Sequence, residues 1–140
     1  MSFLNFQAKL KQFSCYEDVL ALKLIEKYQL SSTYLKNDDN KFDLQLSNGL
    51  TYELKCDMMG NKTGNCFIEF AGYGKPSGIA TSEADYYVFT FDLLTYHQIE
   101  LMKLKEIIQN GKFRIVKTAD KSTYGHLVSM KTIIANAEQI

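Results

Sequence analysis

Residues 41–70 decide the fold of this chain, and they read KFDLQLSNGLTYELKCDMMGNKTGNCFIEF. Apolar and polar residues alternate over 42–47 and again over 50–55, and this period of two predicts two half-buried strands. Asn48-Gly49 lies between them and tolerates the positive φ angles of a tight turn. We therefore predict a β-hairpin at this point in the chain.

Three charged side chains meet in this hairpin. Pairing of its strands brings Asp43 back beside Glu53 and Lys55, and the period of two places Glu53 and Lys55 on one face. Mg²⁺ prefers oxygen ligands and keeps several waters, so Asp43, Glu53 and the carbonyl oxygen of Leu54 are candidate metal ligands. Lys55 is a candidate for positioning the attacking water or for neutralising charge on a phosphate. Such a metal acts as Lewis acid and template for in-line hydrolysis of a phosphodiester.

The spacing of these residues also resembles a known pattern. Asp43, nine residues and then Glu53-Leu54-Lys55 resembles the D…(D/E)-x-K signature of the PD-(D/E)XK nuclease superfamily, which includes restriction endonucleases, Holliday-junction resolvases and many phage nucleases. The downstream segments FIEF and GKPSGIATSEADYYVF resemble the strand, loop, short helix and strand that follow the catalytic hairpin in small phage-type members. The resemblance covers roughly residues 17–91, and it departs from the pattern at Phe42, where the superfamily has Pro.

The resemblance implies a fold and an activity. The expected fold is α/β, a restriction endonuclease-like core with a central mixed β-sheet flanked by helices in the order α-β-β-β-α-β. The expected activity is that of a Mg²⁺-dependent endodeoxyribonuclease, with Mn²⁺ as a substitute, acting on duplex or branched DNA. Since so small a chain has no separate targeting domain, we expect it to read DNA shape, with a junction as first substrate, and to cut two strands as a homodimer.

Glu17 has two interpretations. Ser14 with Glu17 is typical of a capping box, which predicts a helix over about 15–28 and a bond from Glu17 to the Ser14 backbone. Related nucleases, by the resemblance, often supply a carboxylate to the metal from this first helix. Both interpretations remain open, so Glu17 stays a candidate catalytic acid.

Glu69 is a second supplementary acid. It interrupts an apolar strand predicted over 66–70, where an unpaired carboxylate is costly. We expect this strand to neighbour Glu53 and Lys55, which would aim Glu69 at the metal. The alternative is a residue at the rim of the sheet.

Three residues are candidate nucleic-acid contacts. Lys62 lies in a predicted polar loop over 56–65, and Lys75 and Ser77 lie in a predicted turn over 72–78. Loops beside an active strand often carry binding groups, although ordinary surface turns have the same composition.

The charge of the chain gives little support to DNA binding. It has 16 basic and 16 acidic residues, whereas DNA-binding proteins usually show a basic footprint. A modest basic excess occurs over 103–121, which contains six Lys or Arg residues and two acidic residues, Glu106 and Asp120. A solvated helix and strand would show the same bias.

The rest of the chain reads as a single domain spanning 1–140, a length that can bury an ordinary core. Hydrophobic residues at 46% exclude a disordered chain. The patterns predict further elements as follows: helices over 2–13, 79–84, 95–110 (with Thr95 and Gln98 as a cap) and 130–138, and strands over 31–35, 86–91, 113–117 and 126–129.

Composition also excludes several classes of protein. No apolar stretch approaches the ~20 residues that span a bilayer, and we see no secretory signal. Three cysteines without metal-binding spacing are typical of reduced thiols. We therefore expect a cytoplasmic protein, in the host cytoplasm if phage-encoded, with no membrane and no small-molecule cofactor.

Two further function classes fit the same residues. One is a catalytically inactive nuclease-fold module that binds nucleic acid or a protein. The other is a structural protein in which Asp43, Glu53 and Lys55 form an exposed, salt-bridged hairpin, because charges alternating on a solvent face are common.

Overall fold

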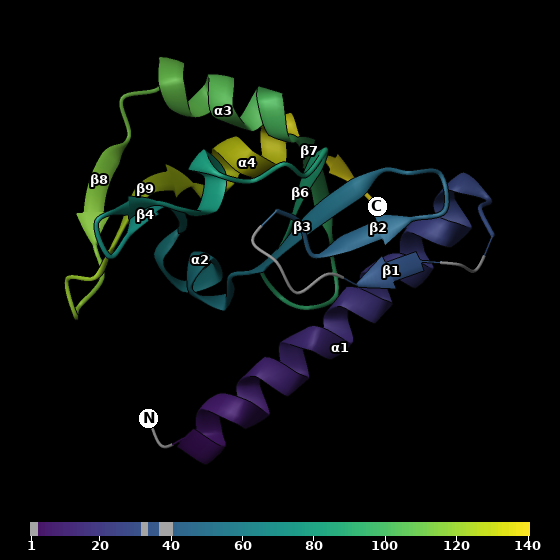
Figure 1. Ribbon diagram of the computed structural model, residues 1–140. Coiled ribbons are helices and arrows are strands. Elements are labelled where there is room, and N and C mark those ends of the chain that lie inside the picture. Colours follow the sequence, from purple (N-terminus) through teal and green to yellow (C-terminus); the bar gives the residue numbers. More distant parts are fainter. Residues whose placement is uncertain (1–2, 32–33, 37–40) are drawn as a thin grey trace.

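The computed structural model describes residues 3–31, 34–36 and 41–140, with side chains from Tyr16 onward. In these ranges the chain forms two β-sheets with four α-helices packed around them (Figure 1). The predicted α/β class with a mixed sheet and flanking helices is therefore confirmed.

The first sheet has six strands and contains the predicted hairpin. Its strands lie in the order β1 (Tyr34–Lys36), β2 (Leu44–Leu46), β3 (Thr51–Cys56), β6 (Tyr86–Thr90), β7 (His97–Glu100) and β10 (Glu138–Gln139). The β3–β6 pair is parallel and the other pairs are antiparallel. A parallel neighbour requires a long crossover, which the chain between Cys56 and Tyr86 supplies.

The second sheet is built from part of that crossover and from the C-terminal region. Its strands lie in the order β5 (Lys75–Pro76), β4 (Asn65–Gly72), β9 (Thr123–Ser129) and β8 (Arg114–Lys117), all antiparallel. The prediction that the strand around Glu69 neighbours Glu53 and Lys55 is wrong, because β3 pairs with β2 and β6. Alternation in sequence reports which face of a strand is buried, not which strand lies beside it.

The predicted hairpin is confirmed. Leu44 pairs with Tyr52 across β2 and β3. The Leu46 N–H donates to the Leu50 carbonyl at 3.0 Å, and the Gly49 N–H donates to the Leu46 carbonyl at 2.9 Å. Gly49 has φ +88°, so this glycine supplies the left-handed residue that closes the loop.

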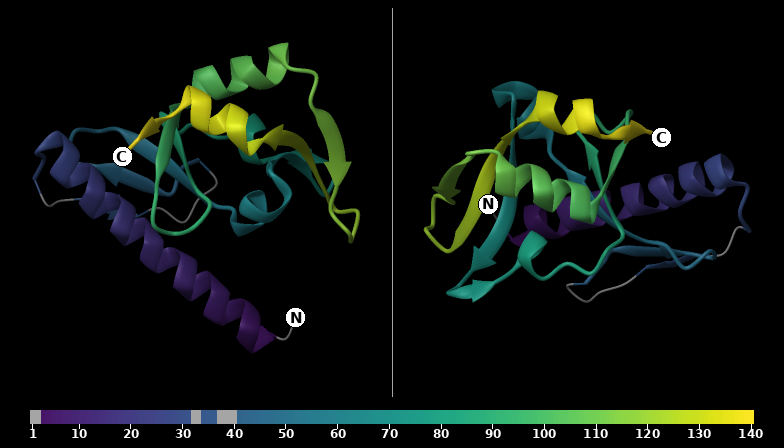
Figure 2. Two further views of the ribbon diagram at one scale, coloured as in Figure 1. Left: turned by 180° about the vertical axis from the view of Figure 1, so that it is seen from behind. Right: turned by 90° about the horizontal axis from the view of Figure 1, so that it is seen from above.

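One continuous helix, α1 (Phe3–Tyr28), occupies the region where two were predicted. Ser14 lies inside it, so the predicted capping box at Ser14 and Glu17 is wrong. The segment contains no Gly or Pro that would end a helix earlier. Figures 1 and 2 show its N-terminal half extending away from the sheets. Neither α1 nor any other described helix is both long and apolar enough to cross a membrane.

The predicted loop after β3 contains a short helix, α2 (Met58–Thr63). Asp57 caps it by accepting a hydrogen bond from the Gly60 N–H at 2.9 Å. Gly64 ends it with φ +78°. The predicted loop is therefore wrong, because an Asp cap followed by a left-handed Gly can enclose a helix of six residues.

Two other helices differ from their predictions. The helix predicted over 79–84 is a single 3-10 turn, η1 (Gly78–Ala80). Helix α3 (Leu101–Asn110) begins later than predicted, because His97–Glu100 pairs with β6 as strand β7. The last helix, α4 (Met130–Asn136), lies where it was predicted and is followed by β10.

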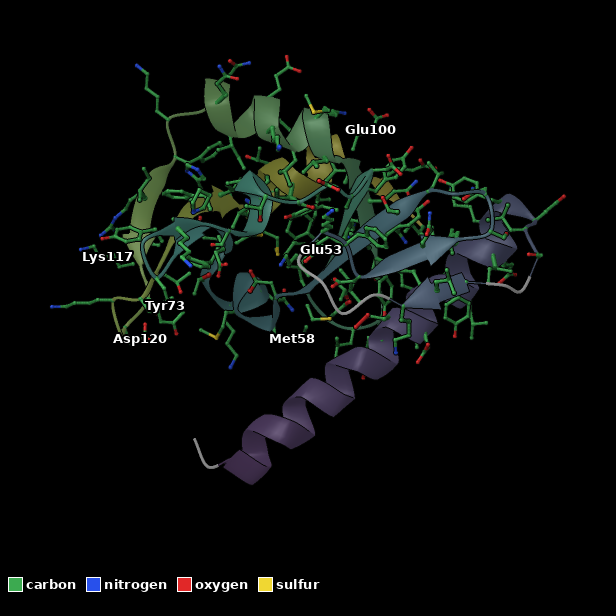
Figure 3. The ribbon with its side chains drawn as sticks, in the orientation of Figure 1. Glu53, Met58, Tyr73, Glu100, Lys117 and Asp120 are labelled. Atoms are coloured by element: carbon green, nitrogen blue, oxygen red, sulfur yellow. The ribbon has the colours of Figure 1, made fainter. Side chains whose placement is uncertain are left out.

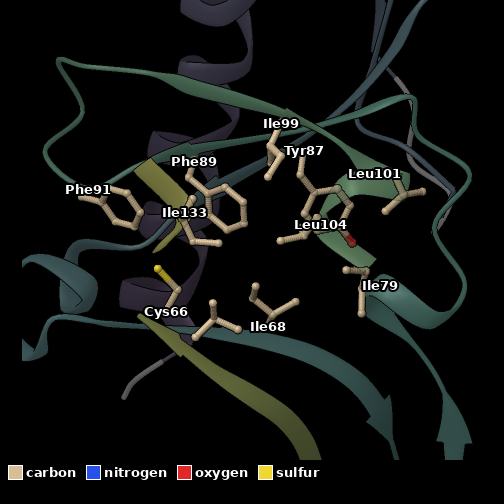
Figure 4. Close-up of a cluster of buried hydrophobic side chains, with 11 residues drawn as sticks. Cys66, Ile68, Ile79, Tyr87, Phe89, Phe91, Ile99, Leu101, Leu104 and Ile133 are labelled. Carbon is tan, nitrogen blue, oxygen red and sulfur yellow. The ribbon is translucent and has the colours of Figure 1, made fainter. Parts of the chain in front are cut away.

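Two hydrophobic cores hold these elements together. The larger joins both sheets, α3 and α4, and its buried side chains include Cys66, Ile68, Tyr87, Phe89, Leu104 and Ile133 (Figure 4). The smaller lies between α1 and the first sheet and includes Leu20, Leu24, Leu44, Tyr52 and Val88. Tyr87 and Val88 are neighbours in β6 and point into different cores, so the first sheet is covered on both faces.

Gly78 provides a test of how the crossover packs. A Cβ atom there would lie 2.2 Å from the Glu69 carbonyl oxygen, at φ +54°. We expect Gly78→Ala to lower the free energy of unfolding by about 2 kcal/mol or more, since it adds overlap to backbone strain. Gly74→Ala is the matched control, because its φ is +77° but no atom lies within 4 Å. Equal thermal midpoints of the two variants, followed by circular dichroism, would contradict this packing.

Candidate active site

The candidate site lies where β2 begins. The Asp43 N–H donates to the Tyr52 carbonyl at 2.9 Å, and Asp43 Oδ2 accepts a hydrogen bond from the Leu54 N–H at 2.8 Å. Strand β2 starts only at Leu44. The Asp43 side chain therefore accepts the hydrogen bond from the Leu54 N–H that a backbone carbonyl would accept if β2 were longer. The carboxylate is thereby fixed beside the middle of β3.

The carbonyl oxygen of Leu54 faces the same edge. The N–H and C=O of one strand residue point to the same neighbouring strand, and the Leu54 N–H points to Asp43. The backbone oxygen predicted as a metal ligand therefore lies on the side of β3 where Asp43 is held.

Glu53 and Lys55 lie on one face of β3, as their spacing predicts. Lys55 Nζ is 3.2 Å from Glu53 Oε1, and the two side chains are 40% and 16% exposed. The same ammonium lies 5.8 Å from the centroid of the Tyr87 ring. The salt bridge is thus half-buried rather than part of an open solvent face, which argues against a merely exposed hairpin.

Helix α1 places Glu17 at this site. Glu17 precedes Leu20, Ala21 and Leu24 on one face of the helix, and those three side chains are fully buried. The next residue, Asp18, anchors the helix to β1 by accepting hydrogen bonds from the Tyr34 hydroxyl at 2.8 Å and Lys36 Nζ at 3.3 Å. Burial and, after it, the negative charge of Asp43 raise the pKa of Glu17 to about 7, while the charge of Lys36 opposes the rise.

The other two carboxyl groups are perturbed in the same direction. Burial raises the pKa of Asp43, while the Leu54 N–H and Lys55 oppose the rise. Burial also raises the pKa of Glu53, with Lys55 opposing and Asp43 adding to it. Burial thus disfavours the charged form of all three carboxyl groups, an electrostatic condition that a bound cation would relieve.

A pocket of about 150 Å³ opens at this point. It is lined by Glu17, Asp43, Leu54, Lys55 and Cys56. Among the described residues, no three His, Cys, Asp or Glu side chains are grouped closely enough to hold one metal ion. Magnesium is usually bound through one or two carboxylates and keeps several waters. The carboxylates of Asp43 and Glu53, together with the Leu54 carbonyl oxygen, are therefore enough ligands in number.

The remaining predicted residues lie elsewhere. Glu69 is half-buried on β4 in the second sheet, although its charge reaches Tyr87. Lys62 is exposed on α2, and Lys75 is exposed on β5. The Ser77 hydroxyl is buried without a hydrogen-bond partner among the described residues, so it points into the protein rather than to a ligand.

Tyr87 and Cys56 belong to the site and were missed from sequence. Tyr87 is opposite Glu53 in the parallel β3–β6 pair, and its pKa is raised by burial and then by the charge of Glu53. Burial is the largest cause that raises the pKa of the Cys56 thiol to about 11, and the negative charges of Glu17 and Asp43 act in the same direction. Only the pairing of β3 with β6 could have identified Tyr87, and sequence alternation carries no such signal.

No protein-family model, curated protein or solved structure matches the chain. The residues of the site and their geometry are therefore what indicates a function. They combine the Asp43 carboxylate, a backbone oxygen, a second acid with a pKa of about 7 and one ammonium group around a pocket, and this ammonium group pairs with Glu53, which does not line the pocket.

The raised pKa of Glu17 predicts a pH-dependent stability. Between pH 4.5 and about 7 the folded protein holds a proton that the unfolded chain has lost, so stability falls as pH rises through this window. In metal-free buffer at pH 8, Glu17→Gln should raise the thermal midpoint by about 3 °C, equivalent to about 1 kcal/mol after allowance for solvent screening. At pH 4 the two proteins should melt together.

Glu26→Gln, on the exposed face of the same helix, is the control and should leave the midpoint unchanged at both pH values. A Glu17→Gln variant that is equally or less stable than the parent at pH 8 would contradict the placement of Glu17 among the other acids.

Proposed function

We propose that this protein is a metal-dependent DNA endonuclease that hydrolyses phosphodiester bonds. The observation that carries the proposal is the fixed arrangement at the hairpin, where Asp43 accepts a hydrogen bond from Leu54 at 2.8 Å and Lys55 pairs with Glu53 at 3.2 Å. Strand β3 thus carries two oxygen ligands, from Glu53 and Leu54, and the ammonium group of Lys55 beside a pocket.

The donor set fits Mg²⁺, with Mn²⁺ as a substitute. Asp43 and Glu53 would hold the ion with the Leu54 carbonyl, and all three groups are hard oxygen ligands. The raised pKa values of the two carboxyl groups are consistent with a site that a cation would stabilise. When bound, such an ion supplies Lewis-acid polarisation of the phosphate and a lower pKa for its water.

Lys55 has the role of a positioning and charge-neutralising group. Its ammonium is held between the Glu53 carboxylate and the Tyr87 ring. From this position it can donate a hydrogen bond to an attacking water or to a phosphate oxygen, and it offsets charge that develops on the phosphate.

Glu17 has the role of a proton acceptor across the pocket from β3. A carboxyl group with a pKa of about 7 exchanges its proton near neutral pH, which suits general acid–base work. Glu69 is not assigned a role in hydrolysis, since it lies on the second sheet.

Part of the chain order supports the core that the PD-(D/E)XK resemblance implies. Helix α1 is followed by β1, β2 and β3, then by the short helix α2, and later by β6 parallel to β3. Strands β4 and β5 and the turn η1 also lie between β3 and β6, and both strands belong to the second sheet. The three strands β1–β3 followed by a strand parallel to β3 support the proposed restriction endonuclease-like core.

We further propose branched DNA, cut by a homodimer in the cytoplasm (the host cytoplasm if the protein is phage-encoded), as the setting of this activity. The basis is the resemblance to the PD-(D/E)XK superfamily, which includes Holliday-junction resolvases. Two active sites related by a two-fold axis can cut two strands symmetrically.

Cleavage of a supercoiled plasmid and of a four-way junction tests the activity. Wild-type protein should cut in Mg²⁺ or Mn²⁺ and not in EDTA. Asp43→Asn and Lys55→Ala should each lower the rate by at least about 100-fold, because each removes a group that acts on the reacting atoms. The cleavage rates of the wild type and of each variant are measured by gel analysis of single-turnover time courses.

Lys131→Ala, an exposed lysine on α4, is the matched control and should cut at the wild-type rate. Cleavage by Lys55→Ala at that same rate would place the activity outside this site. Symmetric cuts confined to the junction would support a resolvase.

A catalytically inactive module that binds nucleic acid is the second candidate. It is favoured by the absence, among the described residues, of a group of three metal-binding side chains. Binding of the junction without cleavage in any metal would establish this candidate and contradict the endonuclease. Neither cleavage nor binding of either substrate would contradict both.

A further inference from the structure

Two hairpin tips of the second sheet are joined into one surface. We call residues 72–75, which connect β4 to β5, and residues 117–123, which connect β8 to β9, the joined tips. The Tyr73 N–H donates to the Ser122 carbonyl at 2.8 Å, and Gly72 pairs with both Lys75 and Thr123. Figure 3 shows Tyr73, Lys117 and Asp120 together at one end of the molecule, well away from Glu53.

The longer tip is held rigid by its own hydrogen bonds. Asp120 Oδ1 accepts from the Thr118 hydroxyl at 2.6 Å, the Ser122 hydroxyl at 2.7 Å and the Ser122 N–H at 3.0 Å. These bonds lower the pKa of Asp120 to about 2. The carboxylate is therefore engaged within the turn, and the tip presents a preformed surface.

Tyr73 is an unexpected residue at its position. It has φ +53° and is followed by Gly74 at φ +77°, the two positive angles of a type I′ turn, which favours Asn, Asp and Gly. The Tyr73 side chain is 82% exposed, so packing gives nothing in return for the unfavourable backbone. A strained residue with a fully presented side chain indicates a function outside the fold.

The charges of the joined tips are mostly positive. Lys75, Lys117 and Lys121 are exposed there, against Asp120 as the acidic residue of these segments. Lys117 Nζ lies 5.1 Å from the centroid of the Tyr124 ring, which holds the lysine over the sheet. The joined tips thus carry one exposed aromatic side chain and three exposed ammonium groups, in a chain whose net charge is zero.

We propose that the joined tips bind unpaired nucleotides of DNA, with Tyr73 stacked on a base and Lys75, Lys117 and Lys121 against phosphates. Stacking on an aromatic ring with a cationic track beside it is how proteins hold single strands. An intact duplex hides its base faces, so the surface fits DNA with a single-stranded arm or an open branch. The inference rests on the proposed function and names its substrate class: branched DNA with unpaired bases next to duplex.

Fluorescence anisotropy in EDTA tests the proposal without any cleavage. The probes are a labelled fork, which has a duplex and a single-stranded arm, and a blunt duplex of the same length. Wild-type protein should prefer the fork. Tyr73→Asn should bind the fork at least about fivefold more weakly and remove most of that preference, whereas Tyr73→Phe should bind as the wild type does.

Asn fits the turn better than Tyr does, so the thermal midpoint of Tyr73→Asn should equal or exceed that of the wild type. This separates loss of a contact from loss of the fold. Lys117→Ala and Lys121→Ala should each make the negative slope of log binding constant against log salt concentration shallower by about 0.7–0.9. Lys131→Ala on α4 should leave this slope unchanged.

Equal fork affinity of Tyr73→Asn and the wild type would overturn the proposal, and so would equal wild-type affinity for fork and duplex. The outcomes also separate this inference from the endonuclease. If the wild type cuts DNA but fork binding ignores Tyr73, the inference alone fails. If fork binding depends on Tyr73 but nothing is cut in any metal, the endonuclease alone fails.

Discussion

The hydrogen bond from the Leu54 N–H to the Asp43 carboxylate, at 2.8 Å, is the contact on which the candidate site depends. It exists because β2 begins at Leu44, so that among the described residues no strand pairs with the second half of β3 on that edge. Asp43 satisfies one of the open backbone groups and is thereby fixed beside Glu53 and Lys55. The Leu54 carbonyl faces the same edge, so the end of strand pairing is also what exposes oxygen ligands.

The surrounding fold keeps this cluster of charges partly dehydrated. Helix α1 covers one face of the first sheet and brings Glu17 in, while Asp18 ties that helix to β1. The opposite face packs on the second sheet, α3 and α4. Burial raises the pKa of all three carboxyl groups, so the two cores hold together an arrangement that like charges oppose. Such a site gains stability when a cation binds.

Local features of this chain could be predicted from sequence, and long-range ones could not. The hairpin followed from alternation and from Asn48-Gly49, and the same spacing brought Asp43, Glu53 and Lys55 together. The sheet of Glu69 could not be predicted, because alternation does not say which strands pair. Whether Glu17 caps a helix or faces the site depended on where α1 begins. The Ser14–Glu17 pattern predicted a helix start at that point, but no residue interrupts the helix and α1 begins at Phe3. Tyr73 also escaped prediction, since Tyr-Gly is not a usual type I′ turn pair.

Anomalous scattering from crystals of the wild-type protein grown with Mn²⁺ tests the metal site without any assumption about substrate, because it locates the metal itself. We predict one or more manganese ions in the pocket lined by Glu17, Asp43 and Leu54. At least one ion should lie within about 2.5 Å of oxygens from both Asp43 and Glu53. Asp43→Asn crystals should lose that peak. A wild-type map with no peak at this pocket, or with its peak elsewhere on the protein, would contradict a metal site formed by Asp43 and Glu53.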